Sequence, residues 1–167
     1  MKNLKQNILS GKIFIYPTDT IYGIGCDATN IRSVERIKEI KARDKDKPFS
    51  IIAPSINWIK QNCIIDKELE ENLPKYLPGP YTLILKKKKP DFLFHVSASD
   101  TIGIRIPDSD FTKQIQKSGV PFITTSVNLS GEPFAKSIKD ISKDIIDKVD
   151  YVINAKDESM LSGKPSI

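Results

Sequence analysis

An arginine stands near the end of a predicted strand in the segment TIGIRIP, residues 101–107. Strand alternation places its three isoleucines on one face and Thr101, Gly103 and Arg105 on the other. A glycine inside a strand often marks the close approach of a ligand, and a guanidinium fork suits a carboxylate or a phosphate. The segment therefore predicts a core face and, opposite it, an anion site. The alternative is a solvent-facing strand with an incidental arginine.

Two other segments repeat this pattern of small polar groups. In PFITTSVN, residues 121–128, Thr124, Ser126 and Asn128 form one stripe ahead of a turn. In YPTDTIYGIGCDATN, residues 16–30, two threonines share a face and glycines follow. Hydroxyls beside turns are also common for local reasons. In an α/β sheet, however, such stripes can converge on one cleft, so the three segments together indicate a ligand site.

A cationic loop is the natural partner for such a site. The segment KARDKDKP, residues 41–48, carries four cations: Lys41, Arg43, Lys45 and Lys47. Charge-assisted hydrogen bonds from these groups could close over a polyphosphate. Two aspartates between them partly neutralise the loop, and composition alone favours an ordinary solvated helix end.

These residues need a layered sheet to position them. Short β-like runs alternate with amphipathic stretches, which predicts an α/β fold with helices packed on a sheet. The predicted strands cover residues 12–16, 49–53, 81–86, 101–106, 121–128 and 150–153. The clearest helix covers residues 31–43 with Asn30 as its N-cap, and Ser137 is expected to cap a later helix.

Composition narrows the class of protein. At 167 residues the chain suits one domain with a core of its own. It has no apolar run near the roughly 20 residues needed to span a bilayer and no secretion signal at its N-terminus, so we expect a cytoplasmic protein. A net charge of +5 is compatible with nucleotide or RNA partners. It is equally compatible with a lysine-rich amino-acid composition that reflects genome bias.

Several common sites are not predicted. Cys26 and Cys63 are too few for a disulfide framework or a zinc site, and His95, the only histidine, is expected in a surface or connecting position. The lysine run at residues 86–89 is expected to mark a solvated strand end. Neither a dinucleotide-binding glycine motif nor a P-loop is present, and no protein-held metal site is predicted.

Taken together, the segments YPTDTIYGIGCDATN, KARDKDKP, YLPGPYTLILKKK, TIGIRIP and TTSVNLSGEP resemble the YrdC family of threonylcarbamoyl-AMP synthases. The similarity runs in order from about residue 12 to residue 137. It implies a single domain over residues 1–167, C-terminally short relative to its relatives. The implied fold is a twisted, largely mixed or parallel sheet with flanking helices and a basic cavity.

The resemblance also implies a reaction. L-threonine and bicarbonate form a carbamate, which attacks the α-phosphate of ATP and releases pyrophosphate. Mg²⁺ is expected to accompany ATP. The adenylate would pass to a separate transferase complex that makes threonylcarbamoyladenosine in tRNA. Because the carbamate is the nucleophile, catalysis would depend on positioning and on cations rather than on a covalent protein nucleophile.

Site residues follow from the matching motifs. The resemblance implies threonine contacts at Thr20, Arg105 and Thr124, and ATP contacts at Arg43, Lys47, Thr101, Ser126 and Asn128. Lys41 and Arg43 are the implied catalytic cations, Lys41 acting on charge at the phosphates or the carbamate. Gly23 and Gly25 would let the backbone approach a small amino acid.

Two positions and the end of the chain depart from the family pattern. Asp44 stands where many members have proline, and Ile52 stands where longer members have histidine. The chain stops at residues 164–167, although Ser166 is still expected to be able to reach the site. The second hypothesis is a non-catalytic RNA-binding or RNA-maturation protein of the same fold. A third is a carbamoyl-transfer domain, which normally belongs to much larger proteins.

Overall fold

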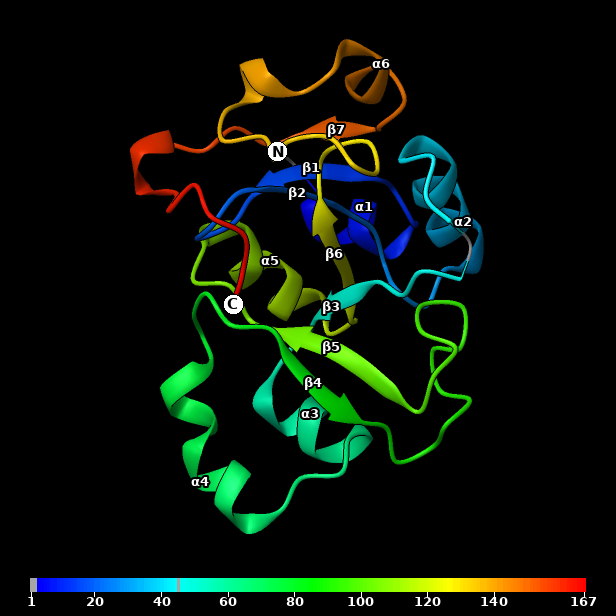
Figure 1. The fold of residues 1–167 in the computed structure, drawn as a ribbon, viewed down its shortest axis with the longest axis vertical. Coiled ribbons are helices and arrows are strands. Elements are labelled where there is room, and N and C mark those ends of the chain that lie inside the picture. Colours follow the sequence, from blue (N-terminus) through cyan, green and yellow to red (C-terminus); the bar gives the residue numbers. More distant parts are fainter. Residues whose placement is uncertain (1–2, 45) are drawn as a thin grey trace.

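A mixed sheet of seven strands forms the centre of the computed structural model, which describes residues 3–44 and 46–167 (Figure 1). The strand order is β4-β5-β3-β6-β2-β1-β7. The strands are β1 (Phe14–Pro17), β2 (Tyr22–Gly25), β3 (Ser50–Ile52), β4 (Leu83–Lys86), β5 (Thr101–Arg105), β6 (Phe122–Ser126) and β7 (Tyr151–Val152). The β1–β7 and β3–β5 pairs are parallel and the other four pairs are antiparallel. The predicted mixed α/β sheet is therefore confirmed.

Six α-helices flank the described part of the sheet. They are α1 (Leu4–Leu9), α2 (Ile31–Ile40), α3 (Ile56–Asn62), α4 (Lys67–Tyr76), α5 (Asp110–Ser118) and α6 (Lys143–Ile146). As predicted, Asn30 caps α2, its side chain accepting a hydrogen bond from Ser33 N. The helix ends at Ile40, three residues before the predicted end, because Ala42 has a left-handed φ of 48°. Arg43 consequently lies on the following loop.

The helix expected after Ser137 is divided into two short elements. Ser137 begins a capping box, but the element it starts is a 3-10 helix over Ile138–Asp140, and α6 begins only at Lys143.

The two faces of the sheet carry different cores. Phe14 and Tyr16 of β1 and Phe122 of β6 pack against α1 and α5, where Phe111 stacks on Tyr16 at a centroid distance of 4.8 Å. The opposite face buries the alternate strand residues beneath α2, α3 and α4, including Ile15, Ile24, Ile51, Ile104 and Ile123. This alternation follows from the two-residue repeat of a strand. It confirms the predicted core face of β5.

Strand β2 was not predicted, because its sequence YGIG has a low β-propensity. Tertiary contacts explain its glycines. A Cβ atom on Gly25 would lie 1.8 Å from the carbonyl oxygen of Ile123, so glycine allows β6 to approach. The expectation that Gly25 admits a ligand was therefore wrong, since a neighbouring strand already occupies that space.

The lysine run at residues 86–89 is only partly solvated. Lys87 is 1% exposed, and its Nζ donates to the carbonyls of Phe92 and Ser97 at 2.9 and 3.0 Å. The prediction of a solvated strand end was wrong for this residue, because its long stem reaches inward to unpaired carbonyls of the following connection. His95 is half-buried in that connection, with its Nε2 2.6 Å from the carbonyl oxygen of Ala28.

Among the described residues, no helix combines the length and the apolar character that crossing a membrane would require. Cys26 and Cys63 are both buried free thiols.

Candidate active site

A cavity of about 190 Å³ lies over β2, β6 and β3, on the face that α1 and α5 cover farther along. Its floor is made of residues that face one another in the strand register: Gly23 opposite Ser126, and Thr124 opposite Ser50. These side chains are small, whereas the adjacent part of the same face carries aromatic rings. The small side chains leave a cavity above the sheet at this place. The volume suits a molecule smaller than a drug-sized ligand, such as an amino acid.

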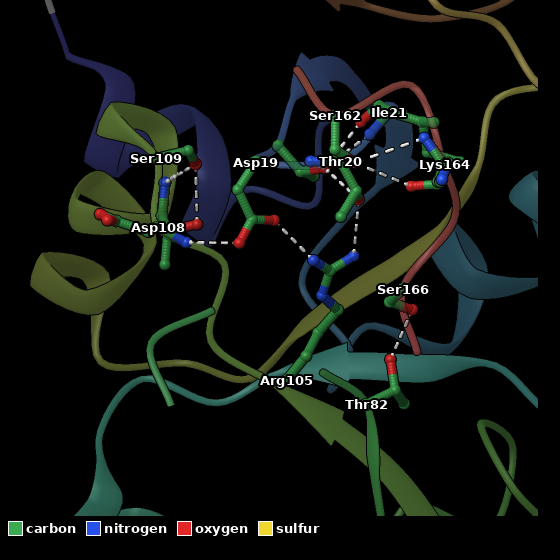
Figure 2. A network of polar contacts seen from close by, with 12 residues as sticks. Asp19, Thr20, Ile21, Thr82, Arg105, Asp108, Ser109, Ser162, Lys164 and Ser166 are labelled. Atoms are coloured by element: carbon green, nitrogen blue, oxygen red, sulfur yellow. Dashed lines mark hydrogen bonds and ion pairs between the residues drawn. The ribbon is translucent and has the colours of Figure 1, made fainter. Parts of the chain in front are cut away.

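Arg105 supplies the buried positive charge of this cavity. The residue is 5% exposed and lies at the end of β5. Its Nη2 donates to Oδ1 of Asp19 at 2.7 Å, and its Nη1 donates to the Thr20 hydroxyl at 3.4 Å (Figure 2). Burial lowers the pKa of Arg105 and the Asp19 carboxylate opposes that shift, and an arginine stays charged. No described residue accepts a hydrogen bond from its Nε, so the guanidinium keeps N–H groups that are not paired within the protein.

Threonine hydroxyls connect this arginine to the turn between β1 and β2. The hydroxyls of Thr18 and Thr20 lie 2.9 Å apart, and Thr18 donates to the carbonyl of Ile21 at 2.7 Å. Thr18 lines the cavity. Thr20 is 1% exposed and does not line it, but its hydroxyl contacts Arg105, which does. The structure thus brings together the three polar segments that the sequence predicted to converge.

Arg43 reaches the cavity from the loop after α2. Its guanidinium lies 4.8 Å from the centre of the Phe49 ring, and Nη2 donates to the Pro48 carbonyl at 2.7 Å. Burial lowers its pKa. Lys47 of the same loop is exposed and does not line the cavity, and Lys45 lies outside the described residues.

Lys41 has a different setting from the one its motif implied. It is 2% exposed, and its Nζ donates to the carbonyls of Ser126 and Asn128, the second at 2.8 Å. Burial, and secondarily the charge of Arg43, lower the pKa of Lys41 to about 7. In this structure Lys41 does not line the cavity but fixes the end of β6 beside it.

Two further predicted ATP contacts lie away from the cavity lining. The Thr101 hydroxyl lies 3.1 Å from that of Ser99. The Nδ2 of Asn128 donates to the carbonyl of Glu132 at 2.6 Å, while its buried Oδ1 has no partner among the described residues. The roles of both residues stay predictions.

Of the residues that close the site, sequence reasoning expected Ser166 and missed Asp19 and Pro165. Asp19 had a signal, since it stands between two threonines, but its ion pair with Arg105 spans 86 positions. A closing segment, residues 162–167, returns to the cavity and places Pro165 and Ser166 in its lining. The Ser166 hydroxyl lies 2.7 Å from that of Thr82, and Gly163 N donates to the Thr20 carbonyl.

Comparison with known proteins identifies the fold and its family. The family model Sua5_yciO_yrdC, described as "Telomere recombination", matches residues 6–166. The chain belongs to this family. Its members include the YrdC proteins that the sequence motifs resemble.

Several relatives carry the name threonylcarbamoyl-AMP synthase. A protein of Methanocaldococcus jannaschii, "Putative threonylcarbamoyl-AMP synthase", is 42% identical over 90% of this chain and 71% of its own length. The Pyrococcus abyssi "Threonylcarbamoyl-AMP synthase" is 31% identical over 88% of this chain. The present chain spans only 44% of that Pyrococcus protein.

Two solved structures have the same fold, each with a TM-score of 0.80. Pyrococcus abyssi Sua5 complexed with L-threonine superposes with a TM-score of 0.80 at 30% identity, covering 90% of this chain and 45% of that one. Escherichia coli YciO has a TM-score of 0.80 at 26% identity, covering 97% of this chain and 79% of its own.

Proposed function

We propose that this protein is a threonylcarbamoyl-AMP synthase, and so a nucleotidyltransferase, that uses L-threonine, bicarbonate and ATP. One observation carries the proposal. A buried guanidinium with donors to spare stands in the wall of a hydroxyl-lined cavity of amino-acid size. The relatives named as this enzyme, and the threonine complex of a similar fold, support it.

In this proposal Arg105 binds the carboxylate of threonine, and Thr124 with its neighbouring hydroxyls contacts the rest of the amino acid. The amine attacks bicarbonate and water leaves, which gives the carbamate. A carbamate oxygen then bonds to the α-phosphorus of ATP, and the bond to the pyrophosphate leaving group breaks. The protein contributes by holding the two reactants together and by facing the charged transition state with Arg43.

Mg²⁺ enters the proposal with ATP. The described residues contain no group of three or more metal-binding side chains. In this proposal the phosphate oxygens of ATP supply most of the ligands of Mg²⁺, as is common for magnesium nucleotides. The adenylate would then serve a separate tRNA-modifying transferase in the cytoplasm.

The test is pyrophosphate release by the purified protein with ATP, Mg²⁺ and bicarbonate. Release should depend on threonine. Arg105→Ala should lower kcat/KM for threonine, and the loss should correspond to about 2–4 kcal/mol of transition-state free energy because a buried charge contact is removed. Arg36→Ala is the matched control, since Arg36 pairs with Asp150 at 2.9 Å on the surface. Release that is absent, or indifferent to threonine, would refute the proposal.

A further inference from the structure

Asp19 lies behind the cavity wall and not in the lining. Both oxygens of its carboxylate are occupied: Oδ1 accepts from Arg105 at 2.7 Å, and Oδ2 accepts from Asp108 N at 3.2 Å (Figure 2). Its main-chain carbonyl accepts from Ser162 N at 3.2 Å. The side chain is only 15% exposed. One residue thus joins the β1–β2 turn, the end of β5, the approach to α5 and the closing segment.

Arg105 depends on these contacts for its orientation. A long arginine side chain has many rotamers, and holding it in one of them costs conformational entropy. This guanidinium donates its described hydrogen bonds to Asp19 and Thr20, and the Thr20 contact is long at 3.4 Å. The ion pair is therefore the main restraint. It occupies one of the five guanidinium N–H groups and Thr20 a second, which leaves three without a described partner.

We propose that Asp19 is a positioning residue that holds Arg105 in the orientation required to bind the substrate carboxylate. The proposal rests on the proposed function, because it assumes that Arg105 meets threonine. Asp19 also repels a second carboxylate, so removing it has two effects of opposite sign. The direction of the change in threonine affinity therefore decides whether positioning or repulsion dominates, and we expect positioning to dominate.

The experiment is calorimetric titration of L-threonine into the whole protein and its variants. Asp19→Ala should weaken threonine binding by about tenfold to a hundredfold, the loss of one charge-assisted hydrogen bond. Asp19→Asn keeps an oxygen that can accept from Arg105 and should weaken binding by only about three- to tenfold. ATP affinity should stay within twofold, roughly, because the change is confined to the carboxylate contact.

Asp150→Ala is the matched control. Asp150 likewise accepts a hydrogen bond from an arginine, Arg36, at 2.9 Å and one from a backbone amide, Ile13 N, at 2.8 Å. It does not line the cavity. Its loss should affect stability and leave threonine affinity unchanged. Unchanged or tighter threonine binding in the Asp19 variants, or an equal loss of ATP affinity, would overturn the positioning role. A wild-type protein that does not bind threonine would instead overturn the proposed function.

Discussion

Two basic residues of one motif have separate surroundings, although the sequence places them two positions apart. Arg43 lines the cavity, whereas Lys41 is buried against the carbonyls of Ser126 and Asn128. Composition alone favoured a solvated helix end, whereas the family resemblance implied that both cations serve the site, and the structure places Arg43 in the cavity lining. The sequence could not separate the two roles, because the left-handed turn at Ala42 and the distant β6 carbonyls decide which way each side chain points.

The lowered pKa of Lys41 predicts a pH-dependent stability. The folded pKa is about 7 and the ordinary value is 10.5. Between these values the unfolded chain holds a proton that the folded protein lacks, so this group makes the protein more stable as pH rises. Lys41→Met removes this term and leaves two carbonyls unpaired. Its deficit in unfolding free energy should therefore grow by about 2 kcal/mol from pH 7 to 9.

Denaturant unfolding of both proteins at several pH values measures this difference. Lys60→Met is a suitable control, because Lys60 forms an exposed pair with Glu70. A deficit that is constant from pH 6 to pH 9 would contradict the lowered pKa.

At the scale of elements, local pattern predicted the strands whose alternation is strong. Ile102, Ile104 and Ile123 were assigned to the core face, and Thr124 and Ser126 to the cavity face, as the structure has them. The N-cap of α2 was identified at Asn30. Strand β2 could not be found in this way. Its two glycines were expected to admit a ligand, and the reason for them, the closeness of β6 and of the Tyr16 ring, exists only in the folded sheet.

The two glycines of β2 should differ in their tolerance of a methyl group. In Gly25→Ala the new Cβ meets a backbone carbonyl at 1.8 Å, which requires β2 and β6 to separate. In Gly23→Ala it meets Tyr16 ring atoms at 3.1–3.3 Å, and a ring can shift slightly. Gly25→Ala should cost about 3 kcal/mol or more of unfolding free energy, and Gly23→Ala about 1 kcal/mol.

Thermal or denaturant unfolding of the two variants, made in the same background, checks this order. Equal stability of the two would show that β2 and β6 do not approach as closely as the structure indicates.

At the scale of the whole molecule, the meeting of three polar segments and the approach of Ser166 were predictable, but the path of the closing segment was not. Polar stripes at strand ends carry a local signal, and sheet geometry brings such ends together. The closing segment carries no periodic signal. Its place depends on hydrogen bonds to Pro80, Thr82 and Thr20, which are distant in sequence.

Because the cavity lining comes from both halves of the sheet, a bound ligand should stabilise the whole fold. Threonine at about 100 times its dissociation constant should add about 2.7 kcal/mol, which raises Tm by about 5–10 °C for a domain of this size. Thermal denaturation with and without threonine measures the shift. Arg105→Ala should abolish it, and an undiminished shift in that variant would place the amino acid elsewhere.

The small floor residues of the cavity have an evolutionary consequence. Ser50 and Thr124 contribute little to either apolar core, so the scaffold does not require them to remain small. A bulkier side chain at either position would fill the hollow and leave the surrounding architecture standing. Catalysis could then be lost in a single mutational step while an intact, inert protein persisted, available for some other task.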